Sequence, residues 1–110
     1  MTPTEKIAHL NDKARKGLLP GSTRVLLTPL VSALPEPLLL CLQDAIAEFD
    51  TFTEDNDPYG ERDFGAVEIE SERYFWKIDY YDRSLRFGAE DASNVSETVR
   101  VMTLMHASEY

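Results

Sequence analysis

Two neighbouring segments, residues 64–70 and 74–81, alternate between apolar and polar side chains. The apolar positions of the two segments are Val67, Ile69, Tyr74, Trp76, Ile78 and Tyr80. A period of two residues is typical of a strand that buries one of its faces. Because the link around Ser71 is short, a hairpin with an even-numbered loop places these side chains on one face. We predict that this face packs against the core.

Apolar spacing and turn residues predict three helices and two further strands around the hairpin. We expect a helix from Thr4 to Gly17, a strand over 24–28, a helix starting near Pro35, a strand over 85–87, and a last helix capped by Ser93 or Asn94 and carrying Val95, Val99, Met102 and Met105. This order is typical of an α+β fold, with a mainly antiparallel sheet of about four strands and helices packed on one face. The 110 residues are expected to form a single domain, residues 1–110.

The spacing within the helices also predicts which side chains are buried. The outer face of the first helix is expected to carry Lys6, Lys13, Arg15 and Lys16. Cys41 falls within the apolar stripe of the second helix, so we expect a buried and inert thiol. A single cysteine cannot form an intramolecular disulfide, and the longest apolar run, residues 37–42, is too short to cross a membrane. We therefore expect a cytoplasmic protein without a membrane segment.

Charge is distributed unevenly along the chain. The 20 acidic residues outnumber the 11 Lys and Arg and give a net charge of -9. Residues 1–24 contain five bases and two acids, whereas residues 44–72 contain eleven acids and one base. So acidic a chain repels phosphate, which argues against direct contact with nucleic acid. The acidic stretch is either a solvated surface that keeps the protein soluble or a binding site.

A cation site is one use of clustered carboxylates. Residues 55–60 begin like an EF-hand loop, but Tyr59 stands at the fifth ligand position and Ala66 where the bidentate Glu is required. A magnesium site needs only a few converging carboxylates, and the candidates here are Asp57, Glu61, Asp63, Asp79 and Asp82. A metal-dependent hydrolase or nuclease built on these residues is therefore an alternative function. No motif for a nucleotide, a dinucleotide or a catalytic nucleophile is present, and we expect no cofactor.

Two long segments carry a resemblance to a known family. The first is NDPYGERDFG, residues 56–65, and the second is FWKIDYYD, residues 75–82. In both, the chain resembles short bacterial and phage proteins that are catalogued only as a domain of unknown function. Arg62 stands where that family usually has His, and Glu70-Ser71 where Asp-Gly is common. The resemblance implies occurrence on phages and other mobile elements and carries no activity with it.

These observations favour a small acidic, non-enzymatic interaction protein. The odd-numbered side chains of residues 75–81 mix aromatic and charged groups on the face away from the core, which suits a partner surface. The predicted partner-binding residues are Glu54, Asp55, Asp57, Tyr59, Glu61, Asp63, Phe75, Lys77, Asp79, Tyr81 and Asp82. We expect the partner to be a protein with a basic surface, such as a nucleic-acid-binding complex inhibited in the anti-CRISPR or anti-restriction manner. A homodimer that pairs through an exposed strand edge is a further alternative.

Overall fold

The two alternating segments pair as an antiparallel hairpin. The computed structural model describes the whole chain, residues 1–110, and pairs β2 (Phe64–Ile69) with β3 (Glu72–Tyr81). Glu70 and Ser71 form the loop with φ of 51° and 67°. Positive φ at both positions is the geometry of a type I′ turn. The even-numbered loop confirms the predicted face, because Val67 and Ile69 pack against the same core as the buried residues of β3.

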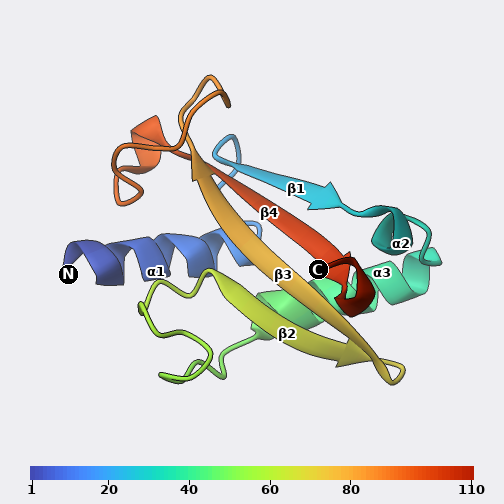
Figure 1. Cartoon of the computed structure of the whole chain (residues 1–110). Coiled ribbons are helices and arrows are strands. Elements are labelled where there is room, and N and C mark those ends of the chain that lie inside the picture. The colour runs from blue at the N-terminus through green and yellow to red at the C-terminus, as the bar shows by residue number, and fades with distance from the viewer.

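The hairpin is one half of a four-stranded mixed sheet with the order β1-β4-β3-β2 (Figure 1). β1 (Thr23–Leu27) runs parallel to β4 (Val99–His106), and β4 runs antiparallel to β3. The helices are α1 (Pro3–Arg15), α2 (Pro29–Ser32) and α3 (Glu36–Glu48), with short 3-10 turns at Val95–Glu97 and Ala107–Glu109. None of the helices combines the length and the apolar character that a membrane-spanning helix needs. The α+β class and the mainly antiparallel sheet are as predicted.

One core lies between the sheet and the helices. Its buried side chains are Val31, Leu42, Ile46, Tyr74, Trp76, Ile78, Met102 and Leu104. They come from α2, α3, β3 and β4, so the α-helices close one face of the sheet, and the other carries no α-helix (Figure 1). Burying these apolar side chains is the main favourable contribution to folding.

The last predicted helix is wrong, because residues 99–106 form the central strand β4. Every residue from Val99 to Met105 except Thr103 is buried. A strand that is paired on both edges and covered on both faces has a continuous run of apolar residues in its sequence. Such a run also matches the spacing of apolar residues in a helix, so the two cannot be distinguished by periodicity. β4 lies between β1 and β3, so the sheet contains a parallel pair that the sequence did not indicate.

The predicted strand over residues 85–87 is also wrong. After β3 the chain turns from Asp82, and Leu85 has a φ of 60°, which a strand does not allow. Only an isolated bridge between Tyr81 and Gly88 remains of the expected pairing. The side chain of Asp82 accepts hydrogen bonds from Ser84 Oγ at 2.7 Å and from the backbone N–H of Arg86 at 3.3 Å, which stabilises the turn.

Two burial predictions are corrected. Arg15, expected on the outer face of α1, is buried, and its Nη1 donates hydrogen bonds to the carbonyls of Ile46 at 2.8 Å and Phe49 at 2.9 Å. It thereby caps the C-terminal end of α3, where the Ile46 carbonyl also accepts the backbone N–H of Phe49 at 3.3 Å. Cys41, expected in the core, is exposed and unpaired, because the buried stripe of α3 is narrow and centres on Leu42 and Ile46.

Gly65 fits closely against the centre of the core. A Cβ atom at this position would lie 2.5 Å from Nε1 of Trp76 and within 2.7 Å of two further ring atoms. Trp76 is fully buried and cannot move aside without disturbing its neighbours. The glycine in the FG pair of the first motif is therefore required by packing.

We predict that Gly65→Ala lowers the free energy of unfolding by about 1–3 kcal/mol, as overpacking of a core does. Urea unfolding followed by Trp76 fluorescence measures the loss. Gly88→Ala is the matched control, because an added Cβ there meets only the backbone oxygen of Tyr80 at 3.8 Å. Equal stability of the two variants would contradict the close approach of Gly65 to the indole.

Candidate functional site

The acidic loop, residues 50–63, connects α3 to β2 and is fastened to the rest of the molecule by a buried polar network. Asn11 of α1 donates from Nδ2 to the carbonyl of Glu61 at 2.9 Å and to the hydroxyl of Tyr80 at 2.8 Å. The Tyr80 hydroxyl donates in turn to Oε1 of Glu61 at 2.8 Å. Burial is the main cause of a raised pKa of Tyr80, so its hydroxyl remains a donor at neutral pH.

Arg100 supplies the positive charge of this network. It comes from the central strand and is fully buried. Its Nε donates to Oδ1 of Asn11 and its Nη2 to the carbonyl of Ala92, both at 2.6 Å, and its guanidinium lies 5.2 Å from the centroid of the Tyr80 ring. Nη1 is buried without a partner. Burial lowers the pKa of Arg100, whereas Tyr80 and Glu61 favour its charged form. Glu61 is therefore one of the groups that compensate a buried cation.

Hydrogen bonds inside the acidic loop fix its shape. Thr53 and Asn56 cap each other, with the Thr53 N–H donating to Oδ1 of Asn56 at 2.8 Å and the Asn56 N–H donating to Oγ1 of Thr53 at 3.3 Å. Asp57 accepts the backbone N–H of Arg62 at 3.0 Å. Arg62 then donates from Nη1 to Oδ2 of Asp12 on α1 at 2.7 Å. Gly60, with a φ of 71°, allows the chain to turn between these contacts.

Three predicted site residues in the acidic loop have no such structural contact. Glu54, Asp55 and Tyr59 are exposed, and their side chains make no hydrogen bond or ion pair. The side chain of Tyr59 is 84% exposed. Because Asp57 and Glu61 hold the loop together, the predicted residues of the loop that remain free for a partner are Glu54, Asp55 and Tyr59.

The acidic loop also brings several carboxylates near one another. Burial is the largest cause of a raised pKa of Asp63, and the charges of Glu61, Asp57 and Asp79 add to it. Asp82, the fifth predicted metal ligand, is instead engaged in the turn after β3. No group of three or more His, Cys, Asp or Glu side chains is placed to hold a metal ion.

The predicted residues of β3 lie on the sheet face without helices. Phe75 is half-buried between Phe64 and Tyr110, with ring centroids 5.3 Å from each. Lys77 and Asp79 form an ion pair with Nζ 3.2 Å from Oδ2. Tyr81, also half-buried, lies further along the same strand. The predicted site residues thus form two surfaces, the acidic loop and the open sheet face, which approach each other where Asp79 lies near Asp63.

Asn11 and Arg100, which position the acidic loop, are not among the residues predicted from the sequence. Asn11 falls on the apolar stripe of α1, between Ile7 and Ala14 at helical spacing, and Arg100 interrupts the apolar run of β4. A polar residue at a position where the pattern calls for an apolar one is the signal that could have found them, because buried polar groups need partners.

Comparison with known proteins places the chain in a family. A family model described as "Protein of unknown function (DUF3768)" matches residues 27–109. The chain belongs to the DUF3768 family. The matched region of this DUF3768 chain includes the acidic loop and the strands β2, β3 and β4, whereas α1, which supplies Asn11, precedes it. No curated protein and no solved structure matches the chain.

We predict that Asp63→Asn stabilises the protein at neutral pH. The pKa of Asp63 is higher in the folded chain than its ordinary value of 3.8. Folding therefore takes up a proton between these two pKa values, and the wild-type protein gains stability relative to the variant as the pH falls. The stability gained by Asp63→Asn should be larger at pH 7 than at about pH 4, as measured by urea unfolding.

Asp55→Asn removes one charge from the same loop at an exposed position and is the control for this comparison. A gain from Asp63→Asn that is no larger at pH 7 than at about pH 4 would contradict the burial of the Asp63 carboxylate.

Proposed function

We propose that the protein is a small acidic, non-enzymatic interaction protein whose acidic loop docks on a basic surface of another protein. The observation that carries this proposal is the position of Tyr59, which is 84% exposed on a loop that is tied to α1 and to β3. An aromatic side chain displayed on a braced loop that also carries the free carboxylates of Glu54 and Asp55 has the composition of an interface anchor with a charged rim.

The bracing of the loop supports binding because it lowers the entropic cost of association. A loop that is already held in one shape loses little freedom when a partner binds. Tyrosine adds a large contact area with few rotatable bonds, so its own ordering costs little. The hydrogen bonds of Asn56 and Asp57 within the loop, and that of Glu61 with Tyr80 of β3, thus support binding indirectly.

The charge of the acidic loop supports a basic partner. The loop, residues 50–63, contains six acids and a single base, Arg62, which contacts Asp12. A concentrated negative field speeds encounter with a positive surface and disfavours other partners. Surfaces of that kind are the nucleic-acid-binding grooves of proteins, which are lined with Lys and Arg. We therefore propose a nucleic-acid-binding protein as the target, with the acidic loop occupying the place of phosphates.

The open sheet face extends this surface. Asp79 lies near Asp63 of the acidic loop, and Phe75, Lys77 and Tyr81 continue from it along β3. Within the same proposal, the protein acts in the cytoplasm of a bacterium as an inhibitor encoded by a phage or another mobile element, of the anti-CRISPR or anti-restriction type. The exposed, unpaired Cys41 fits a reducing compartment. No observation in the site favours the hydrolase or nuclease alternative.

A competition experiment tests this function. Purified restriction endonucleases and RNA-guided nucleases are mixed with a labelled DNA duplex, and fluorescence anisotropy reports how much duplex the protein displaces. We expect displacement from at least one of these enzymes at micromolar protein. Tyr59→Ala should weaken it about thirtyfold, as loss of an interface anchor does, and Glu54→Lys with Asp55→Lys should weaken it further.

The matched control reverses two acids elsewhere. Glu90 and Glu97 are exposed and make no side-chain hydrogen bond or ion pair, so Glu90→Lys with Glu97→Lys changes the net charge by the same amount without touching the acidic loop. This control should compete as well as the wild-type protein. Absence of displacement throughout the panel, or equal loss in the control and the loop variants, would overturn the proposal.

A further inference from the structure

β1 has a free backbone edge. The carbonyl of Ser22 accepts the N–H of Arg100, and the N–H of Thr28 donates to the carbonyl of Leu104. Because backbone groups alternate in direction along a strand, these two bonds assign the even-numbered residues of β1 to β4. The N–H and C=O groups of Thr23, Val25 and Leu27 therefore point away from the sheet.

Both faces of this edge strand are apolar and exposed. Val25 and Leu27 pair with Met102 and Leu104, so they lie on the helix face, and Leu26 lies on the opposite face. Their exposed fractions are 47%, 37% and 53%, respectively. A strand that is apolar on both faces is typical of the interior of a sheet. Natural sheet edges are usually protected by charges instead.

The other edge of the sheet shows that protection. β2 carries Glu68 within the strand, and Glu70 is the first residue after the strand. Both glutamates are exposed. β1 has only Arg24. The apolar band also extends beyond the ends of β1, to Leu18 before it and Leu30 after it, which are both exposed. The composition of the β1 edge is therefore that of a surface that another strand covers.

We propose that β1 is the interface of a homodimer, in which β1 of a second copy pairs antiparallel with it and Val25 lies opposite Val25. In this register Thr23 lies opposite Leu27 of the second copy, so all three outward-facing residues of each strand pair with one another. The two sheets would then form one continuous sheet. The arrangement is isologous, which is the commonest symmetry of soluble oligomers.

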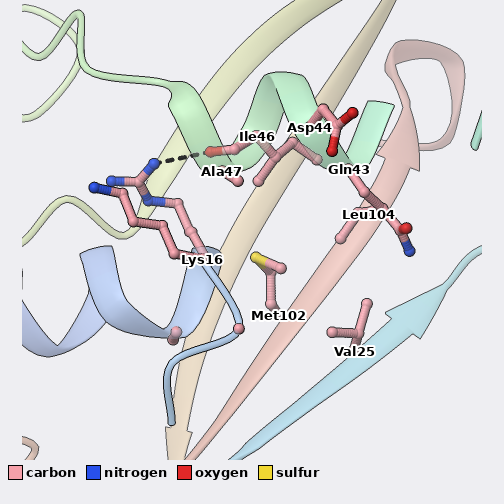
Figure 2. A pocket seen from close by; sticks show the side chains of 11 residues that line it. Lys16, Val25, Gln43, Asp44, Ile46, Ala47, Met102 and Leu104 are labelled. Atoms are coloured by element: carbon pink, nitrogen blue, oxygen red, sulfur yellow. Dashed lines mark hydrogen bonds between the residues drawn. The ribbon is translucent and has the colours of Figure 1, made fainter. Parts of the chain in front are cut away.

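Two charges beside β1 support a second copy of the chain as the partner that covers this edge. A groove between β1 and the helices is lined by Lys16 at one end and by Gln43 and Asp44 near Leu104 at the other (Figure 2). Lys16 and Asp44 are exposed and form no ion pair within the chain. An antiparallel pair places the start of one β1 next to the end of the other. Lys16 of each copy therefore faces the Asp44 end of the groove in the other copy. The positive and the negative end of this surface thus meet across the interface.

Pairing through β1 also keeps like charges apart. β1 and β2 form opposite edges of the sheet, and the acidic loop leads into β2 (Figure 1). In the dimer the two acidic loops lie at the far ends of the joined sheet, where repulsion between them is weakest and screening by salt is strongest. The dimer does not depend on the proposed function, and both acidic loops stay accessible in it.

Light scattering on a gel-filtration column tests the dimer. The wild-type protein should elute with twice the monomer mass at high micromolar concentration. Val25→Lys, which sets two ammonium groups opposite each other at the symmetry axis, should elute as a monomer. Phe87→Lys is the matched control, because Phe87 is 70% exposed and lies outside the β1 edge. It should remain dimeric. Circular dichroism verifies that each variant is folded.

Exchanging the charges of Lys16 and Asp44 tests the antiparallel register separately, because it leaves the sequence of β1 unchanged. Lys16→Glu and Asp44→Lys should each raise the dissociation constant of the dimer up to about thirtyfold, because each breaks two symmetry-related ion pairs, and exposed ion pairs contribute up to about 1 kcal/mol each. The double variant should recover wild-type dissociation. A monomeric wild-type protein, a Val25→Lys protein as dimeric as Phe87→Lys, or additive weakening in the double variant would overturn the proposal. None of these results bears on competition with DNA.

Discussion

The buried charge of Arg100 is the constraint on which the arrangement of this molecule depends. A guanidinium cannot leave water unless hydrogen-bond acceptors and negative charge meet it inside the protein, and leaving such a charge without partners costs about 3–5 kcal/mol. Here the partners come from separate parts of the chain: Asn11 from α1, Tyr80 from β3, Ala92 from the linker before β4, and Glu61 from the acidic loop. The positions of these parts are therefore coupled.

This coupling gives the acidic residues two different roles. Glu61 interacts with the buried network, and Asp12 forms ion pairs with Arg15 and Arg62, so these carboxylates belong to the folded structure. Glu54 and Asp55 carry charge that the fold does not use. A high density of like charge disfavours the compact state. Glu61 and Asp12 offset that cost through their interactions with the buried cations. Glu54 and Asp55, together with Tyr59, are the groups that the surface presents to other molecules.

The sequence predicted the β2–β3 hairpin from a local pattern, wrongly predicted a strand over residues 85–87, and failed at β4 and Arg15, where long-range packing decides. The β2–β3 hairpin was predictable because one face is buried and the other is not, which leaves a period of two in the sequence. β4 was not, because burial on both faces removes that period and leaves an apolar run that also fits a helix. Arg15 was placed in solvent because its partners, the carbonyls at the end of α3, are 31 and 34 residues away in the chain.

The candidate site shows the same division. Its location was predictable, because the turn formers and acids of residues 50–63 interrupt the apolar pattern. Which acids are free was not, because that depends on hydrogen bonds to Asn11 and Tyr80 across the fold. The paired positive φ values of Glu70 and Ser71 illustrate a third case, since neither residue favours that conformation and only the register of the hairpin requires it.

The central claim is that the buried network holds the acidic loop in one conformation. Backbone amide order parameters of residues 53–62, from nitrogen-15 relaxation, measure this most directly. The hydrogen bonds predict order parameters of about 0.8 or higher, close to those of the strands. Values below about 0.6 in the loop, with rigid strands beside it, would show that the network leaves the loop flexible and would contradict the account.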